Sequence, residues 1–343
     1  MPSTHRHSSD GFSLLELMIA LVILGVITAQ LFVTLTAQQR AHRNELRSLD
    51  VQENARHVLD TIIYDTRNAG MLIPREVAVS TSDGDVANPD RLCVSDGSVF
   101  TIPAAGTDVV WDNLGDRFPG IRVQAVNSPV DFTVTSLNLT ALGALDIDGS
   151  APANDFAIPL GAATRGVILA AADGSRSFCA GLAGTGASSI RIDAIPPAAA
   201  AVAPGHLVAP AILYEVVGTN LLRNGIVMSA NVEDLQVEFW VDALDLGGAP
   251  NPDGTMQEPQ EFPIHDLNSM ANLDTARIRR VRISVMGIAD IDEELVSGSQ
   301  LHRYTGVANR QPTGVTDARK RKLFRASVLP RNLLNPGAIP GVP

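Results

Sequence analysis

The residues with the clearest chemical signal are Gly11, Phe12 and Glu16, which stand at the start of the longest apolar stretch in the sequence. Eleven residues without any charge, 17–27, follow Glu16. A carboxylate near the end of a membrane-length helix costs about 3 kcal/mol on insertion scales, so ionisable residues in such positions usually have a function. Some partner must therefore compensate the charge of Glu16.

Cys93 and Cys179 are the second candidate pair. They lie 86 positions apart. In an oxidising compartment a disulfide between them would close a loop of this length and stabilise the folded state by about 4 kcal/mol in the chain-entropy model. The alternative is two separate buried thiols. No CxxC motif is present, so neither cysteine is predicted to be catalytic.

Enzyme signatures are absent from the sequence. It contains no GxSxG, HExxH or GxxxxGK[ST] motif, and we predict neither catalytic residues nor a cofactor. Two groups of aspartates offer oxygen ligands, but neither follows the EF-hand spacing, so we interpret both as acidic turns and predict no metal site. These groups are Asp83, Asp85 and Asp90, and Asp146, Asp148 and Asp155.

The charge composition argues against general affinity for nucleic acid. The net charge is −11, aromatic residues make up 4%, and Lys320 and Lys322 are the only lysines, whereas phosphate binding favours clustered cations with aromatic residues for stacking. One basic run covers residues 319–325. We interpret it as the solvent-facing side of a final strand, whose basic side chains pair with acidic groups on the surface. Glu238 opposite Arg280 or Arg282 is predicted to be a cross-strand pair of the same kind.

The apolar stretch from Phe12 to Ala37 is long enough to cross a bilayer once, which takes about 20 residues. A secretory signal peptide has a shorter apolar core and is cut after that core. Here Gly11 precedes the core, so cleavage at Gly11 would leave the helix on the mature chain. The alternative is an ordinary signal anchor that carries a stray glutamate.

Beyond the span, the 3.6-residue period predicts that the helix continues to about Ala69. One stripe is apolar, and the opposite side is polar or charged. Asn68, Ala69 and Gly70 form a stop signal. The stripe comprises Val51, Ala55, Val58, Leu59, Ile62 and Ala69.

The rest of the chain reads as β-structure. Five strands are predicted between residues 71 and 219, at 108–112, 121–126, 131–135, 166–171 and 189–195. Three strands with strict alternation follow, at 232–241, 279–286 and 323–330. A striped helix with amphipathic strands predicts an α+β fold, in which a long N-terminal spine helix packs on an antiparallel sheet and a β-rich region is inserted.

The order glycine, aromatic, Ser13, Leu14, Leu15, Glu16 resembles the class III leader of type IV pilins and of type II secretion pseudopilins. Residues 53–70 resemble the helix end of PilW-type minor pilins. Further segments follow the same order and are shared more loosely with pseudopilin J: residues 213–216, 221–225, 232–239, 279–286 and 328–332.

The resemblance implies a leader, residues 1–11, that a prepilin peptidase removes before methylating the new N-terminus at Phe12. That new ammonium group could then pair with the Glu16 carboxylate of a neighbouring subunit. The implied organisation is a transmembrane half of the helix (12–37), an amphipathic half (38–70), a β-rich variable region (71–219), the sheet of the head (220–332) and a Pro/Gly-rich tail (333–343).

The function implied is that of a non-enzymatic minor pilin that helps to initiate assembly of a type IV pilus. Expected partners are other minor pilins, the major pilin, the prepilin peptidase, the inner-membrane assembly platform and the inner membrane itself, with no nucleic acid. The head would lie in the periplasm and later in the filament or at its tip on the cell surface. Alternatives are pseudopilin J of a type II secretion system, a pilus-tip adhesin head and a membrane-anchored periplasmic enzyme.

The number of basic residues on each side of the span opposes an orientation with the leader in the cytoplasm. The leader offers only Arg6, whereas Arg40, Arg43 and Arg47 follow the span, and the positive-inside rule alone would place the other end in the cytoplasm. We nevertheless expect the leader in the cytoplasm, because the peptidase of the resembled family works on that face.

Overall fold

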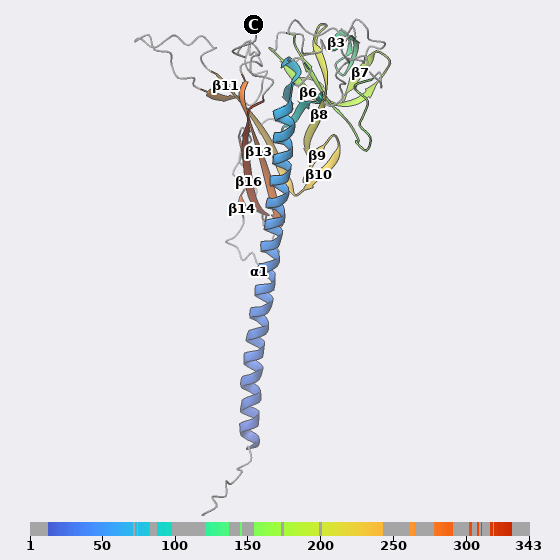
Figure 1. The fold of residues 1–343 in the computed structure, drawn as a ribbon. Coiled ribbons are helices and arrows are strands. Elements are labelled where there is room, and N and C mark those ends of the chain that lie inside the picture. Colours follow the sequence, from blue (N-terminus) through green and yellow to red (C-terminus); the bar gives the residue numbers. More distant parts are fainter. Residues whose placement is uncertain are drawn as a thin grey trace, which may run out of the picture.

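The structure is a computed structural model, and one long helix and antiparallel β-sheets make up its described part, which confirms the predicted α+β fold. The described residues are 13–70, 73, 75–82, 88–97, 121–136, 145, 154–172, 175–198, 201–242, 261–264, 278–290, 302–303, 307–308, 310, 316–317 and 319–330. Figure 1 shows a rod whose lower half stands alone and whose upper half lies within a β-rich head.

The elements have the following bounds: α1 Leu14–Asn68, η1 Arg75–Val77, β1 Val79–Ser82, β2 Arg91–Ser95, β3 Ile121–Ser128, β4 Asp131–Ser136, β5 Gly166–Ala170, β6 Ser177–Thr185, β7 Ser189–Ile192, β8 Leu207–Val217, β9 Asn220–Arg223, β10 Ile226–Ala230, β11 Val232–Asp242, β12 Glu261–Ile264, β13 Ile278–Asp290, β14 His302–Arg303, β15 Thr316–Asp317 and β16 Arg319–Val328.

α1 is one continuous helix of 55 residues, about 82 Å long at 1.5 Å per residue. It begins after Ser13, whose hydroxyl oxygen accepts a hydrogen bond from the backbone N–H of Leu15 (3.3 Å), as an N-cap does. It ends at Asn68, and Gly70 follows with φ 77°. The Gly70 N–H then donates to the Ser95 hydroxyl (2.7 Å). The predicted stop at residues 68–70 is confirmed.

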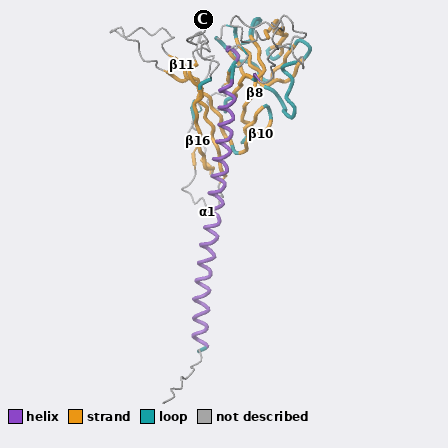
Figure 2. Tube along the Cα trace, in the orientation of Figure 1, coloured by secondary structure: helices purple, strands orange, loops and turns teal. Residues whose placement is uncertain are grey.

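The upper half of α1 packs on a four-stranded antiparallel sheet with the order β12-β11-β13-β16. The predicted stripe of α1 is buried there, and so are the alternating apolar residues of β11 and β13. Gly287 of β13 lets the helix approach closely, because a Cβ at this position would lie 2.7 Å from Val51 Cγ1. Figure 2 shows this sheet running along one side of the helix.

On the outer face of this sheet, Glu238 lies opposite Arg282, as predicted, with an ion pair of 3.7 Å between Arg282 Nη1 and Glu238 Oε2. Gln236 alternates with the core residues of β11 and so lies on this outer face, yet it is fully buried. The segment before β2 covers it, and the Asn88 carbonyl accepts a hydrogen bond from Gln236 Nε2 (3.4 Å). Asp90 there accepts a hydrogen bond from the Val237 N–H (2.8 Å) and donates its own N–H to the Leu235 carbonyl (2.8 Å).

The second sheet has ten strands among the described residues, and part of it closes on itself. β8 pairs with β3, and the pairing continues through β4, β7, β6 and β5 back to β8. Closing a sheet in this way removes its edges. The other half of β8 leaves the ring and pairs with β2 and β9 beside the end of α1.

These pairings correct the predicted domain boundary at residues 219/220. β9 and β10 belong to the ten-stranded sheet, since β9 pairs with β8 and β10 with β9, so the four-stranded sheet begins only at Val232. Nine of the described strands were not predicted from the sequence: β1, β2, β6, β8, β9, β10, β12, β14 and β15. The strand predicted at 108–112 and the tail predicted at 333–343 lie outside the described residues.

Candidate functional site

Of the predicted processing and assembly residues, Glu16 lies at the free end of the rod. Gly11 and Phe12 fall outside the described residues. Glu16 is exposed in the first turn of α1, where the N–H groups without helical partners favour a negative charge. Within the part of the chain that the structure describes, its carboxylate forms no hydrogen bond or ion pair. The compensation that the sequence requires must therefore come from outside this rod.

The surface around Glu16 is apolar on all sides. Every large apolar side chain of α1 from Leu14 to Leu35 is between 51% and 78% exposed. An 18-residue window of the helix has a mean hydropathy of 2.5, and none of it is buried. A continuous apolar surface of this size needs either lipid or other proteins to cover it.

The three threonine side chains of this half are satisfied within the helix. The hydroxyls of Thr28, Thr34 and Thr36 donate to backbone carbonyls of the preceding turn at 2.8 to 2.9 Å. Such bonds let a hydroxyl enter an apolar medium at little cost. Glu16 differs from them, because it carries a charge and has no local acceptor or donor.

Leu46 and Leu49 remain exposed on α1 just below the head. Leu49 lines a cavity of about 480 Å³ between the helix and the ends of β13 and β16, together with Gln52, Ala289 and Lys320. The Lys322 ammonium donates to Gln52 Oε1 at 2.5 Å. These contacts hold the end of the sheet to the helix but leave the two leucines uncovered.

Cys93 of β2 and Cys179 of β6 are joined by a disulfide, with their Cα atoms 5.4 Å apart. Both are completely buried. The bond links the strand beside the end of α1 to the ring of strands, so it ties the two parts of the larger sheet together. It has no access to solvent and offers no reactive sulfur at the surface.

The basic run lies on β16, the end strand of the four-stranded sheet. Arg321 forms a bidentate ion pair with Glu233 at 2.6 and 3.0 Å, while Lys320, Lys322 and Arg325 are exposed. Charged side chains on an end strand discourage pairing with foreign strands. The arrangement fits the interpretation of this run as a strand surface paired with acidic groups.

No cluster of metal-ligating side chains occurs among the described residues. Of the two aspartate groups, Asp83, Asp85, Asp146 and Asp148 lie outside that part of the chain. Asp90 holds the edge of β11 and Asp155 accepts a hydrogen bond from Arg165 through its carbonyl.

The helix is fastened to the larger sheet by a buried polar cluster. Asp65 of α1 accepts hydrogen bonds from the Tyr214 hydroxyl and from Nε and Nη2 of Arg223, the latter two at 3.1 and 2.9 Å. Burial and the adjacent Asp65 charge raise the pKa of Tyr214 above its ordinary value. The tyrosine therefore stays a neutral donor to the carboxylate at any physiological pH.

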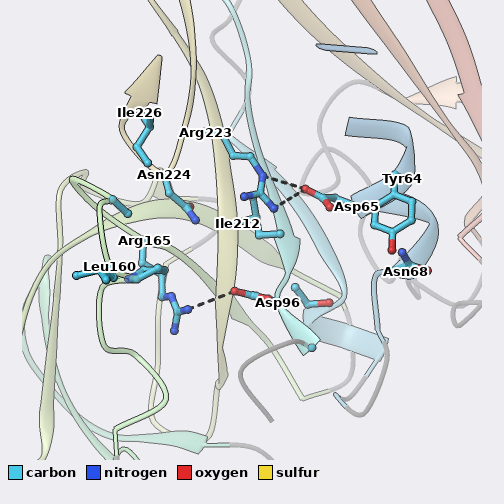
Figure 3. Close-up of a pocket in the computed structure, with 14 residues that line it drawn as sticks. Tyr64, Asp65, Asn68, Asp96, Leu160, Arg165, Ile212, Arg223, Asn224 and Ile226 are labelled. Atoms are coloured by element: carbon cyan, nitrogen blue, oxygen red, sulfur yellow. Dashed lines mark hydrogen bonds and ion pairs between the residues drawn. The ribbon is translucent and has the colours of Figure 1, made fainter. Parts of the chain in front are cut away.

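Next to this cluster is a cavity of about 690 Å³. Figure 3 shows it between the last turn of α1 and the β8–β10 region, with Arg165 bonded to Asp96 and Arg223 to Asp65. The sequence analysis did not identify these residues as a site. One signal was available, because Asn224-Gly225 between two apolar runs is typical of a tight hairpin, and both residues have positive φ, 52° and 75°.

Comparisons with known proteins bear on the N-terminus. Residues 6–29 match the family described as the prokaryotic N-terminal methylation motif, and this range contains Gly11, Phe12 and Glu16. No curated protein matches the chain. Among solved structures, a type IV-like pilin from Thermus thermophilus has 14% sequence identity and a TM-score of 0.22, and the match covers 50% of this chain and 86% of that one. The matched motif thus lies over the start of α1, the one helix among the described residues that is long and apolar enough to cross a membrane.

Proposed function

We propose that this protein is a minor pilin of a type IV pilus, cleaved after Gly11 by a prepilin peptidase and N-methylated at Phe12. The observation that carries the proposal is Glu16, which has no partner among the described residues and lies at the start of the exposed apolar half of α1, within a matched methylation motif. A helix that served only as a transmembrane anchor would not need this carboxylate. A subunit that packs against other subunits would need it, because the carboxylate can pair with the new N-terminal ammonium group of another chain.

The proposed cycle exchanges one covering of α1 for another. In the inner membrane lipid covers the apolar half of the helix, and the head lies in the periplasm. In the filament the spine helices of other pilins cover the same surface, and Glu16 pairs with the ammonium group of a neighbouring Phe12. A buried ion pair costs desolvation of both charges, but breaking it by removing one partner costs about 3 to 5 kcal/mol.

The assignment as a minor component rests on the head and the helix. A head with two sheets is bulky for a subunit that repeats along a whole fibre, and α1 lacks the proline that commonly kinks the membrane helix of major pilins. The resemblance of residues 53–70 and of the later segments to PilW-type proteins supports the same choice. The partners we propose are other minor pilins, the major pilin and the inner-membrane assembly platform.

Mass spectrometry of the N-terminus of the cellular protein tests the proposal. We expect a chain that begins with N-methylphenylalanine at Phe12 when the prepilin peptidase is present, and an uncut chain that begins at Met1 when the peptidase gene is deleted. An uncut N-terminus in cells that possess the peptidase would refute the proposal.

A further inference from the structure

The cavity beside the end of α1 has walls from four parts of the chain. Tyr64 and Asp65 come from the helix, Ser95 from the end of β2, Arg165 from the segment before β5, and Asn224 from the β9–β10 turn. Its volume of about 690 Å³ is within the range of small-ligand sites. Figure 3 shows charged and amide side chains directed toward this space.

Arg165 is a buried and incompletely hydrogen-bonded group in the wall, whose Nη1 donates to the Asp155 carbonyl. The residue is only 4% exposed, and its Nε is buried without a hydrogen-bond partner. Its Nη2 lies 3.3 Å from Asp96 Oδ2, which is longer than the 2.7 to 2.9 Å typical of charge-assisted bonds. Burial lowers the pKa of Arg165 against the opposing effect of Asp96 and Asp155. A buried donor without an acceptor is costly, so the guanidinium gains from any further acceptor.

Two other donors at the same cavity have no acceptor among the described residues. Arg223 uses Nε and Nη2 on Asp65, and its Nη1 has no hydrogen bond within that part of the chain. Asn224 accepts the Leu213 N–H at its Oδ1 (2.8 Å), which fixes the orientation of the amide and leaves Nδ2 as an unused donor. Donors from two segments that lie far apart in the sequence thus converge on the cavity.

Asp65 and Asp96 also line the cavity, and each is paired with one of its two arginines. Asp65 Oδ2 receives bonds from both Tyr214 and Arg223, and the Ser95 hydroxyl oxygen receives the Gly70 N–H. Among the described residues, no acceptor bridges Arg165 to the donors of Arg223 and Asn224. A carboxylate fits this need, since its two oxygens accept several hydrogen bonds at once.

The apolar side chains at the mouth of the cavity indicate which kind of molecule bears the carboxylate. Tyr64, Leu160 and Ile226 line the cavity and are 67%, 107% and 47% exposed, and Val227 beside them is also exposed. Apolar side chains grouped around a polar centre are typical of a surface that another protein covers. A small free acid would leave this rim in water.

We propose that this cavity binds an aspartate or glutamate side chain presented by an apolar segment of another protein. The carboxylate enters between Arg165, Arg223 and Asn224, and the flanking apolar residues cover Tyr64, Leu160 and Ile226. The site belongs to the head alone, so it does not depend on processing at Gly11 or on the role of Glu16.

Isothermal titration of the full-length protein in detergent micelles tests this site. The probe is N-acetyl-leucyl-glutamic acid amide, whose only charge is the side-chain carboxylate; the matched probes are the glutamine peptide and acetate. We expect saturable binding of the glutamate peptide at concentrations up to about 10 mM. It should bind at least about tenfold more tightly than the two matched probes, because a bond to a charged group and the apolar contact both contribute.

Asn224→Asp is the diagnostic variant. It keeps the Oδ acceptor for Leu213, and aspartate tolerates the left-handed backbone at this position. It replaces the Nδ2 donor with a second negative oxygen. We expect binding of the glutamate peptide to fall at least about tenfold, while the thermal unfolding temperature is kept or rises because the new carboxylate bonds the arginines itself.

Asn127→Asp adds the same charge on the exposed β3–β4 hairpin. It removes the Asn127 Nδ2 donor to Thr133 (3.0 Å) but keeps the Oδ acceptor, and it should leave binding of the glutamate peptide unchanged. Four results would overturn the proposal: no binding of the glutamate peptide, equal binding of the glutamine peptide, equal binding of acetate, or equal affinity of the wild type and a folded Asn224→Asp variant.

Discussion

At the scale of single residues, Glu16 is the group whose surroundings must change during the protein's life. It has no partner among the described residues, and the side chains that follow it favour an apolar medium. The threonines of the same helix bond to their own backbone and can pass from lipid to protein without consequence. Glu16 alone among these polar groups gains a charged contact when a second N-terminus arrives.

Replacing Glu16 by valine should separate processing from assembly. We expect Glu16→Val to be cleaved and methylated normally, and to enter filaments at least about tenfold less, because the neighbouring ammonium would lose its counter-charge. Immunoblots of the sheared-filament and membrane fractions measure the ratio. Thr28→Val is the matched control, since Thr28 bonds only to the Leu24 carbonyl (2.8 Å). Wild-type incorporation of Glu16→Val would contradict the role of this carboxylate.

The disulfide gives a second prediction at this scale. Cys93→Ala combined with Cys179→Ala should lower the free energy of unfolding by about 4 kcal/mol, because the loop of 86 residues is no longer closed in the unfolded chain. Denaturant titration followed by circular dichroism measures the loss. Reductant should lower the stability of the wild type but leave that of the double variant unchanged. If reductant has no effect on the wild type even in denaturant, the stabilising role is wrong.

The sequence predicts some of these residues better than others. Glu16 is recognisable because a charge interrupts an apolar run, and Cys93 and Cys179 because they are the only cysteines. Arg165 and Asn224 carry no such signal. They lie far apart in sequence and meet only because β8 pairs with β5 on one side and with β9 further along, a pairing that no local pattern encodes.

At the scale of elements, the contact between α1 and β13 depends on a missing side chain. A Cβ at Gly287 would lie 2.7 Å from Val51 Cγ1, closer than two carbon atoms can pack. We expect Gly287→Ala to cost about 1 to 3 kcal/mol of unfolding free energy.

Val51→Ala should recover part of that loss when both changes are combined, so the two effects will not be additive. Gly184→Ala on β6 is the control, because no atom lies within 4 Å of its added Cβ. Urea titration of the four proteins measures the cycle. Strict additivity would show that helix and sheet do not meet at this point.

The polar cluster of Asp65, Tyr214 and Arg223, which joins α1 to the larger sheet, should contribute less to stability at alkaline pH. Burial and Asp65 raise the pKa of Tyr214 above 10.0, so the folded protein keeps this proton after the unfolded chain has lost it. Its contribution to stability is therefore complete below about pH 10 and is lost as pH rises toward the folded pKa, at up to about 1.4 kcal/mol per pH unit.

Tyr214→Phe isolates this effect. At pH 8 the variant should be less stable by about 1 to 3 kcal/mol, because the hydrogen bond to Asp65 is lost. Urea titrations between about pH 8 and 11.5 should show the difference between wild type and variant shrinking above about pH 10. A difference that is constant over this range would mean that folding does not raise the pKa of Tyr214.

Elements with a clean period are predictable from the sequence, and elements covered on both faces are not. α1 is predicted to within two residues, and β11, β13 and β16 follow from their alternation. β8 was missed because its first eight residues are all buried, so no alternation marks it. β9 and β10 are short, and their signal lay in the Asn224-Gly225 turn rather than in the strands.

At the scale of the whole molecule, the chain divides into a head with its own cores and a rod half that has none. One core lies within the ring of strands and a second between α1, the four-stranded sheet and β8. The lower half of α1 adds nothing to either (Figure 1). The stability of the head therefore does not depend on what surrounds the lower half of α1. That half can exchange lipid for other helices without unfolding the head.

The most direct test of this account is to shear surface filaments from cells and identify the form of the protein in them by immunoblotting and mass spectrometry. The account predicts the chain cut after Gly11, present in the filament fraction in small amount relative to the major subunit. Recovery of the protein only from the inner membrane, with Met1 still attached and nothing in the filament fraction, would contradict it.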